Sequence, residues 1–355
     1  MSQPGAFSPA SDSTGTTGKR GELLLSVREL HAVFETDAGV VNAVDHVSFD
    51  IQRGEVFSIV GESGSGKSVT AMTILGLLPT VKVRGGEILW KGRDLLHTSD
   101  TDMRRVRGGE IAMIFQDPLT ALNPVHTVGR QVAEMARIHE RLPKAKAMER
   151  AIEMLDLVGI PEPRKRAKMH PHEFSGGMRQ RAMIAMAITC KPDLLIADEP
   201  TTALDVTVQA QVLEVLVSIK DEIDSAIMLI THDLGVVAGL SDRVMVMYAG
   251  RQAEVGTADD VFYRTCHPYT LGLLHSIPDV AGDVDVPLEP IPGAPPSLIN
   301  LPTGCAFHPR CFRAEVPGRC NTEVPALRDV PPAQHRAACH FAEDVLAQRV
   351  EVTAR

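Results

Sequence analysis

The chain has 355 residues, of which 44% are hydrophobic and 23% charged, and its formal net charge at pH 7 is −9. This composition is typical of a folded globular protein and argues against disorder over most of the chain. The net negative charge argues against a nucleic-acid-binding protein, because binding a phosphate backbone needs clustered lysine and arginine.

Membrane-spanning and secretion segments are not expected. No apolar run approaches the roughly 18 residues that a membrane-spanning helix needs. Residues 1–21 are rich in Ser, Thr, Gly and Pro and lack an apolar core, so they predict a flexible N-terminal tail instead of a secretion signal. We expect a cytoplasmic protein whose role at a membrane is peripheral.

The first part of the folded region predicts strands. Residues 23–60 alternate apolar and polar positions, with turn signals at 37–39 and 53–54, which indicates an antiparallel strand run. Residues 56–60 form a short apolar strand that leads directly into a glycine-rich loop. Residues 69–78 have helical content.

The remainder predicts an α/β core with an inserted helical segment. Residues 127–169 are charged and carry apolar residues at three- and four-residue spacings, which favours helices. Residues 194–197 and 226–230 are short apolar runs typical of buried parallel strands, with a helix at 206–224 between them. Prolines beyond residue 286 mark a linker into a cysteine-containing tail.

The glycine-rich loop carries the clearest chemistry. Residues 61–68, GESGSGKS, match the phosphate-loop pattern G-x-x-x-x-G-K-[ST] between a predicted strand and a predicted helix. Backbone amides of such a loop wrap phosphates at a helix N-terminus. Lys67 would bridge the β- and γ-phosphates, and Ser68 would ligate Mg²⁺. The expected nucleotide contacts are Gly61, Ser63, Gly64, Ser65, Gly66, Lys67 and Ser68. The alternative is a chance glycine-rich turn.

Asp198 and Glu199 end the predicted strand at 194–197. Desolvating carboxylates costs free energy unless a cation or a reacting proton uses them. Asp198 would hold Mg²⁺, and Glu199 would be the general base that orients the attacking water. A strand that ends in solvent-facing acids is the alternative.

Four further stretches resemble those of ABC transporter ATPases, in the same order along the chain. They are Gln116 (Q-loop), residues 174–180 with the sequence FSGGMRQ (signature), residues 203–205 (D-loop) and residues 231–233 (switch histidine). The resemblance implies a P-loop NTPase of the ABC type, with an antiparallel β subdomain and an inserted α-helical subdomain at about residues 117–170. It also implies that each ATP is bound between the phosphate loop of one subunit and the signature of a facing subunit.

The resemblance also implies roles for single residues. Ser175, Gly176 and Gly177 would bind the γ-phosphate of the facing subunit's ATP, with Asp205 in the D-loop beside them. His232 would contact the γ-phosphate, and Gln116 would reach Mg²⁺ and the attacking water. Phe34 takes the place of an aromatic that stacks on adenine, with a strand core position as the alternative. Met178 replaces the usual glutamine of the signature, but the serine and glycines are retained, so we expect an active ATPase.

Three stretches resemble the oligopeptide and dipeptide importers in particular: residues 116–124, residues 266–274, and the tail from 304 to 340. They imply a nucleotide-binding domain at 22–265, a small Cys-rich C-terminal extension at 266–342 and a C-terminal tail at 343–355. The implied partners are a second, different ATP-binding subunit, two membrane permease subunits and an extracytoplasmic solute-binding protein, with no nucleic acid. The implied place is the cytoplasmic face of the membrane.

Four cysteines crowd the last fifth of the chain: Cys305, Cys311, Cys320 and Cys339. In a reducing compartment such a cluster favours a metal site over disulfides. Four thiolates suffice for a [4Fe–4S] cluster, and some importers of this branch carry one, so this is our expectation, in a structural role. Zinc, bound by four thiolates or by three with His308, His335 or His340, is the alternative, and no metal is the third.

Peptide import is the expected function. Importers of this branch also take nickel chelates, glutathione or sugars, and the chain itself does not specify the substrate. A non-transport ABC ATPase acting in DNA repair or on ribosomes, and a redox-sensing regulator that uses the cysteine tail, are the competing classes. Only one cassette is present, and the interval between phosphate loop and signature lacks sustained heptads, which disfavours the first of these classes.

Overall fold

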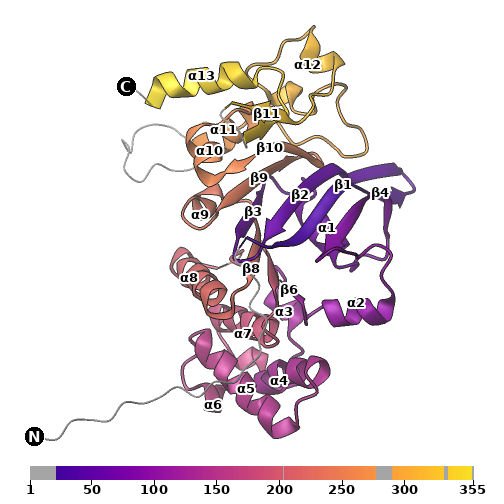
Figure 1. The fold of residues 1–355 in the computed structure, drawn as a ribbon. Coiled ribbons are helices and arrows are strands. Elements are labelled where there is room, and N and C mark those ends of the chain that lie inside the picture. Colours follow the sequence, from indigo (N-terminus) through magenta and orange to yellow (C-terminus); the bar gives the residue numbers. More distant parts are fainter. Residues whose placement is uncertain (1–20, 203, 277–289, 332–334, 354–355) are drawn as a thin grey trace, which may run out of the picture.

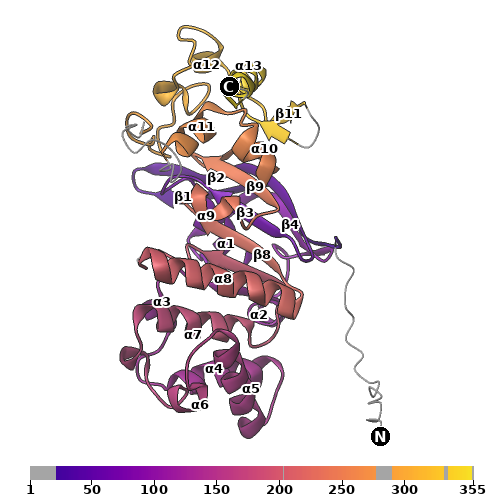
Figure 2. The same ribbon diagram turned by 90° about the vertical axis from the view of Figure 1, so that its left-hand side faces the viewer.

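A computed structural model describes residues 21–202, 204–276, 290–331 and 335–353. Figures 1 and 2 show three levels along the long axis: helices at one end, two sheets in the middle and the C-terminal segment at the other end. Parts of the predicted features lie outside the described residues, namely residues 1–20 of the tail, Ala203 of the D-loop stretch, residues 277–289 with Pro287, residues 332–334 and residues 354–355. Among the described helices, none combines the length and the apolar character needed to span a membrane.

A four-stranded antiparallel sheet with the order β2-β1-β4-β5 covers one side of the middle level. Its strands are β1 (Leu23–Thr36), β2 (Gly39–Gln52), β4 (Val81–Trp90) and β5 (Arg93–Asp94). Buried side chains of this sheet, such as Leu25 and Trp90, share one apolar core with helix α1 (Lys67–Ile74) and the second sheet. The predicted antiparallel strand run is therefore confirmed for its first two strands.

The third strand of that run belongs elsewhere. β3 (Val56–Val60) pairs in parallel with β8 (Ala226–Thr231) and β9 (Arg243–Tyr248), so its assignment to the antiparallel run was wrong. All five side chains of β3 are buried, as expected for a strand covered on both faces, whereas alternation is typical of a sheet with one solvated face.

The second sheet has the order β11-β12-β10-β9-β3-β8-β7-β6. β6 (Ile111–Ile114) and β7 (Leu194–Asp198) run parallel to β8 and β3, with α8 (Val206–Ile223) between β7 and β8. The predicted strands at 194–197 and 226–230 and the helix at 206–224 are thus confirmed. Because parallel strands end at the same edge of a sheet, the loops after β3, β6, β7 and β8 converge there.

Helix α1 departs from its predicted range of 69–78. It begins at Lys67, and its C-cap is Leu75. Gly76 follows with a φ of 57°, a left-handed conformation that ends helices and that glycine adopts without strain. The predicted helix was therefore placed two residues late at its start and four residues too far at its end.

The helical end of the molecule contains α3 (Pro118–Ala121), α4 (Val128–His139), α5 (Lys144–Leu157), α6 (Pro163–Arg166) and the 3₁₀ turn η1 (Pro171–Glu173), followed by α7 (Gly176–Ile188). Small buried residues such as Ala136 and Ala151 let α4 and α5 approach α7 closely. The same apolar core continues into β7 and α8, so these helices are packed onto the sheet and not separate from it. Helix α2 (Asp100–Val106) connects the two sheets.

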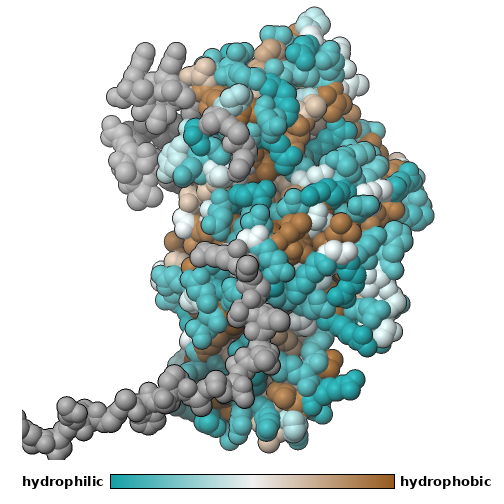
Figure 3. Space-filling view, viewed as in Figure 1, coloured by the Kyte–Doolittle hydropathy of each residue, from teal (hydrophilic) through white to brown (hydrophobic). Residues whose placement is uncertain are grey.

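The C-terminal segment packs on β10 (Arg251–Thr257), which pairs with β9 on one side and β12 on the other. It consists of α10 (Ala258–Tyr263), α11 (Pro268–His275), the turn η2 (His308–Arg310), α12 (Arg319–Thr322), β11 (Arg328–Val330), β12 (His335–Ala337) and α13 (Ala342–Thr353). The short helix α9 (Leu234–Ala238) lies between β8 and β9 in the chain. Its core contains the aromatic rings of Tyr248, Tyr269 and Phe307 in mutual contact. On the face shown in Figure 3, apolar residues form separate patches among hydrophilic ones.

Candidate nucleotide site

The phosphate loop connects β3 to α1, and two of its glycines are sterically required. Gly61 has a φ of 152° and Gly66 a φ of 102°. A Cβ atom at Gly61 would lie 2.2 Å from the carbonyl oxygen of Met247, and one at Gly66 would lie 2.3 Å from that of Ala43. The loop is therefore held tightly between β2 and β9 in a conformation that only glycine allows.

Lys67 and Ser65 give this loop the character of an anion site. The buried Lys67 ammonium donates hydrogen bonds to the carbonyl oxygens of Gly61 (2.7 Å) and Glu62 (2.8 Å), and burial lowers its pKa. The Ser65 hydroxyl is buried and, within the described ranges, has no hydrogen-bond partner. A buried cation and an unsatisfied hydroxyl at a helix N-terminus fit a phosphate group.

Ser68 and Asp198 come together although 130 residues separate them. The Ser68 hydroxyl donates to Asp198 Oδ1 over 2.8 Å. Burial raises the pKa of the Asp198 carboxyl, and the hydrogen bond from Ser68 opposes that shift. A hydroxyl and a carboxylate are the hard oxygen ligands that Mg²⁺ prefers, so these two residues fit a magnesium site beside the phosphate loop.

Glu199 is the centre of a second cluster, at the edge where β6, β7 and β8 end. Its carboxylate accepts hydrogen bonds from Gln116 Nε2 (2.9 Å) and from the Thr202 hydroxyl (2.8 Å), both at Oε2. His232 Nδ1 lies 3.5 Å from Oε1. The three residues predicted from separate motifs, Gln116, Glu199 and His232, are therefore adjacent. Thr202 was not predicted, because a threonine in a loop carries no pattern of its own.

A cavity of about 760 Å³ lies between the phosphate loop and the group of Gln116, Glu199 and His232. Its lining comprises Phe34, Val41, Ala43, residues 62–69 of the phosphate loop and α1, Gln116, Glu199, His232, Leu273, Pro295 and Leu298. Phe34 is half-buried in β1 and lies on the wall of the cavity. All the predicted nucleotide contacts except Gly61 and the signature and D-loop residues line this space.

The signature residues are not in that cavity. Ser175 is the N-cap of α7, and its hydroxyl accepts a hydrogen bond from the backbone N–H of Met178 (3.3 Å). A Cβ at Gly177 would lie 2.6 Å from Val208 Cγ1, so the glycine permits close packing of α7 on α8. Asp205 caps α8 by accepting from the backbone N–H of Val208 (3.0 Å). Within one chain, the structure therefore separates Ser175, Gly176, Gly177 and Asp205 from the phosphate loop.

The four C-terminal cysteines are close enough to influence one another. Burial, together with the neighbouring Cys311, Cys305 and Cys320, raises the pKa of the Cys339 thiol to about 12. Burial, with smaller contributions from Cys305 and Cys320, likewise raises the pKa of the Cys311 thiol to about 11. The backbone N–H of Cys305 donates to the carbonyl oxygen of Cys320 over 2.9 Å.

In the part of the chain that the structure describes, no three of these cysteines have all their sulfur atoms within 4.8 Å of one another. Four thiolates around zinc lie about 3.8 Å apart, given Zn–S bonds of about 2.3 Å. An iron–sulfur cubane binds each thiolate to a different iron atom and spaces the thiolates more widely.

The three histidines considered as zinc ligands have other partners. His308 Nδ1 lies 2.9 Å from the carbonyl oxygen of Cys305, and His340 Nε2 lies 3.0 Å from that of Glu323. Both ring nitrogens of His335 are engaged, Nε2 with Glu254 (2.7 Å) and Nδ1 with Cys266 Sγ (3.4 Å). His335 thus faces a different set of side chains from the four cysteines.

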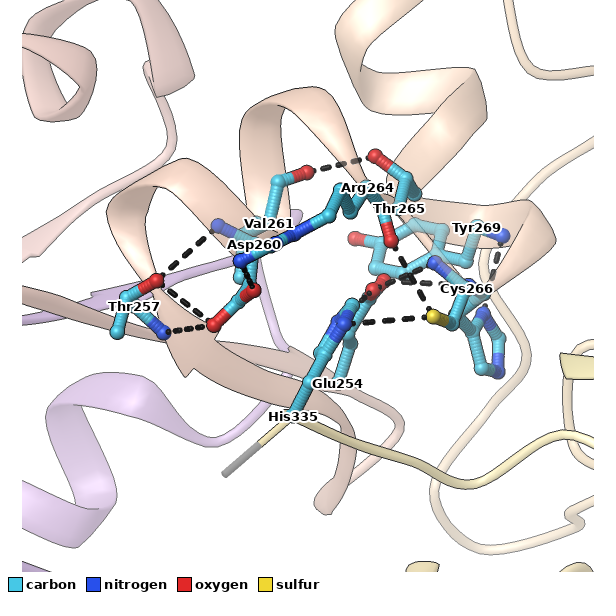
Figure 4. Close-up of polar contacts among 10 residues, drawn as sticks. Glu254, Thr257, Asp260, Val261, Arg264, Thr265, Cys266, Tyr269 and His335 are labelled. Atoms are coloured by element: carbon cyan, nitrogen blue, oxygen red, sulfur yellow. Dashed lines mark hydrogen bonds and ion pairs between the residues drawn. The ribbon is translucent and has the colours of Figure 1, made fainter. Parts of the chain in front are cut away.

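Figure 4 shows the buried network to which His335 belongs. The Glu254 carboxylate on β10 also accepts the backbone N–H groups of Cys266 (2.6 Å) and His267 (3.2 Å). Glu254 and His335 are fully buried, and the ring uses opposite nitrogens for Glu254 and Cys266. This arrangement suits hydrogen bonding between β10, β12 and the start of α11 better than it suits a shared metal ion, because one metal can bind only one ring nitrogen.

The fold and the phosphate loop define a P-loop nucleoside triphosphatase. Residues 44–202 match the ABC transporter family, and residues 253–317 match the C-terminal region of oligopeptide/dipeptide transporters. A probable peptide ABC transporter ATP-binding protein of Sinorhizobium fredii is 53% identical over 92% of this chain and 97% of its own length. The dipeptide transport ATP-binding protein DppD of Bacillus subtilis is 56% identical over 82% of this chain and 87% of its own length.

A solved structure is similar as well. The dimeric ATP-binding cassette MJ0796, in a post-hydrolysis state bound to ADP and Pi, matches with a TM-score of 0.60 at 25% identity and covers 66% of this chain and 99% of its own. The chain belongs to the ATP-binding proteins of the oligopeptide/dipeptide ABC transporter family. It is an ABC-type ATPase.

Protonation of His267 should weaken the junction between the C-terminal segment and β10. Burial lowers the pKa of His267 from 6.5 to about 4, and its Nδ1 accepts the backbone N–H of Tyr269 (3.0 Å). Because the unfolded chain binds this proton more readily, stability is full above pH 6.5 and falls as the pH drops towards 4. The expected loss of unfolding free energy is on the order of 3 kcal/mol.

Chemical denaturation between pH 7 and pH 4 measures this effect. His267→Asn, which keeps a helix-capping acceptor, should flatten the pH dependence, while His275→Asn at an exposed position of the same helix is the control. If the His267→Asn variant lost stability with acid as steeply as the wild type, the assignment would be wrong.

Proposed function

We propose that this chain hydrolyses ATP at the phosphate loop, with Glu199 as general base, to drive peptide import through membrane subunits that it contacts at the cytoplasmic face. The observation that carries the proposal is the position of Glu199. Its carboxylate accepts hydrogen bonds from Gln116 and Thr202 and lies near His232. The residue before it in the chain, Asp198, is hydrogen-bonded to Ser68. A carboxylate held in this way beside a magnesium site is suited to orient and deprotonate water.

The remaining site residues divide into two halves. The first half binds the nucleotide of its own chain. The β- and γ-phosphates are bound by Lys67, the loop amides and the hydroxyls of Ser63 and Ser65. Mg²⁺ is held by Ser68 and Asp198, and adenine stacks on Phe34. When bound, Mg²⁺ neutralises charge that develops on the phosphoryl group. The second half, Ser175, Gly176, Gly177 and Asp205, acts on the ATP of a facing subunit. Its absence from the cavity of its own chain, and the dimeric state of the cassette MJ0796, support this division.

Contact with the membrane subunits takes place next to Gln116. An apolar groove of about 260 Å³ lies between the end of α1, β6, α4 and α7, and Phe115 and four methionines (113, 135, 183 and 186) line it. Methionine side chains adapt to a docked helix, and Phe115 directly precedes Gln116. Docking of a permease segment here, against the helical subdomain at about 117–170, would link transport to the ATP site. A second, different ATP-binding subunit completes the proposed complex.

Peptide is the proposed substrate class because the relatives are named for peptides and dipeptides and because residues 253–317 match the C-terminal region of such transporters. A solute-binding protein outside the membrane would select the peptide. The same ATPase in a nickel, glutathione or sugar importer is the second candidate. The proposed boundaries are a nucleotide-binding domain at 22–265 and an extension at 266–342, between terminal tails at 1–21 and 343–355.

The extension is proposed to hold a [4Fe–4S] cluster on Cys305, Cys311, Cys320 and Cys339. The mutual proximity of four buried or half-buried thiols supports a shared metal site, for which four thiolates suffice in a [4Fe–4S] cluster; zinc remains the second candidate. The cluster would hold together a segment whose secondary structure is short. No step of ATP hydrolysis is assigned to it.

Replacing Glu199 tests the catalytic proposal. Glu199→Gln should retain MgATP binding and lower turnover by at least about a hundredfold, because an amide cannot accept the proton from water. Steady-state phosphate release and equilibrium nucleotide binding measure the two effects. Glu214→Gln, at an exposed position of α8, is the matched control. Normal turnover in Glu199→Gln would exclude Glu199 as the base.

Reconstitution tests the substrate class. With its permease subunits in vesicles, the ATPase should be stimulated by a peptide-loaded solute-binding protein and should import labelled peptide. Stimulation and uptake with a nickel chelate, glutathione or a sugar, but not with peptide, would favour the second candidate.

The metal proposal is tested by Cys311→Ser. Protein purified without oxygen should contain iron and sulfide and absorb visible light, and Cys311→Ser should lose most of both. Cys190→Ser removes a cysteine outside the group and is the control. A colourless wild-type protein that contains stoichiometric zinc would contradict the iron–sulfur assignment.

A further inference from the structure

Arg310 reaches from the C-terminal extension to the phosphate loop. It ends the turn η2, and only 7% of its surface is exposed. Its Nη1 and Nη2 donate to the two carboxylate oxygens of Glu62 over 2.6 and 2.9 Å, and its Nε donates to the carbonyl oxygen of Pro292 (2.9 Å). A two-pronged contact of this kind fixes both the position and the orientation of a carboxylate.

Glu62 is the second residue of the phosphate loop, and it is held at three points. Arg310 binds the side chain of Glu62. The backbone N–H of Glu62 donates a hydrogen bond to the hydroxyl of Tyr269 on α11 over 2.8 Å. Its carbonyl oxygen accepts from the Lys67 ammonium (2.8 Å). Two residues from beyond β10 therefore hold the loop residue that in turn positions the phosphate-binding lysine.

The charge of Glu62 makes this contact important for an anionic ligand. Glu62 is one of the carboxylates that act on the pKa of Lys67, so it lies within electrostatic reach of the phosphate site. Without Arg310, an unpaired negative charge would lie beside the loop and repel phosphate. The guanidinium carbon lies 5.9 Å from the centroid of the Tyr248 ring, and the group remains charged at all physiological pH values.

The extension also supplies part of the cavity wall. Leu273, Pro295 and Leu298 line the same space as Phe34 and the phosphate loop. The neighbouring Ile299 lies 3.5 Å from the position of a Cβ at Gly39, the first residue of β2. The extension therefore contacts both the phosphate loop and the strand pair that carries Phe34.

We infer that Arg310 is a positioning residue of the nucleotide site: by pairing with Glu62 it neutralises the phosphate loop and holds it in register for the nucleotide phosphates. The C-terminal extension is then part of the ATP site of its own chain, and not only an appendix to it. This inference rests on the proposed nucleotide site.

A variant pair separates this role from a purely structural one. In the full-length chain, Arg310→Gln should weaken MgADP binding at least about tenfold, since it leaves the partly buried Glu62 carboxylate without its cationic partner next to the phosphates. Adding Glu62→Gln removes that charge, so the double variant should recover to within about threefold of the wild type. Isothermal titration with MgADP measures each affinity without turnover.

Arg313→Gln is the matched control, because Arg313 is on the same stretch of the extension but pairs with the exposed Asp344 (3.1 Å). It should bind MgADP as the wild type does. Melting temperatures are recorded for every variant. A role confined to the packing of the extension would lower the melting temperature of Arg310→Gln and of the double variant alike, with no recovery of affinity.

Two outcomes overturn the inference: wild-type affinity in Arg310→Gln, or a double variant that binds MgADP no better than Arg310→Gln. If Arg310→Gln does not fold, Arg310→Lys replaces it. Lysine keeps the charge but not the two-pronged contact, so it should weaken binding about threefold; affinity equal to wild type would then contradict the positioning role. A wild-type chain that fails to bind MgADP would instead overturn the nucleotide site itself.

Discussion

The buried ammonium of Lys67 is the interaction on which the rest of the site depends. In the structure it is satisfied by two carbonyl dipoles of its own loop, with the carboxylates of Glu199, Asp198 and Glu62 within electrostatic reach. The glycines allow the loop a shape that no residue with a Cβ could adopt at Gly61 or Gly66. Such a buried cation is well placed to exchange its internal partners for phosphate oxygens.

The parallel part of the sheet explains why distant motifs meet. The strands β3, β6, β7 and β8 end at one edge of the sheet. The phosphate loop, Gln116, Glu199 and His232 therefore meet there although they are far apart in the sequence. Ser175 caps α7 on the helical side, outside the cavity of its own chain. One protomer therefore brings the phosphate loop and Glu199 together but leaves its own signature outside that cavity. Under the proposed function, a facing subunit brings a signature to the γ-phosphate.

Sequence alone predicted what short patterns encode. The loop GESGSGKS, the acids at 198–199 and the short apolar strands are local signals, and the structure brings the first two together through Ser68 and Asp198. The membership of β3 in the parallel sheet and the early end of α1 depend on tertiary packing and on Gly76, so periodicity missed them. The pairing of Arg310 with Glu62 spans 248 residues, and no spacing rule connects two such residues. Tyr269, which is 207 residues from Glu62, was missed for the same reason, whereas Thr202 was missed because a threonine in a loop carries no pattern of its own.

The central claim is that a γ-phosphate is bound from two sides, by the Lys67 loop of one protomer and the Ser175 turn of its neighbour. A high-resolution structure of the assembled transporter, loaded with MgATP in the Glu199→Gln background, tests it most directly. The claim predicts the Ser175 hydroxyl and the Gly177 amide of one subunit within hydrogen-bonding distance of the triphosphate on the other. A loaded complex in which the Ser175 turn faces away from both nucleotides would contradict it.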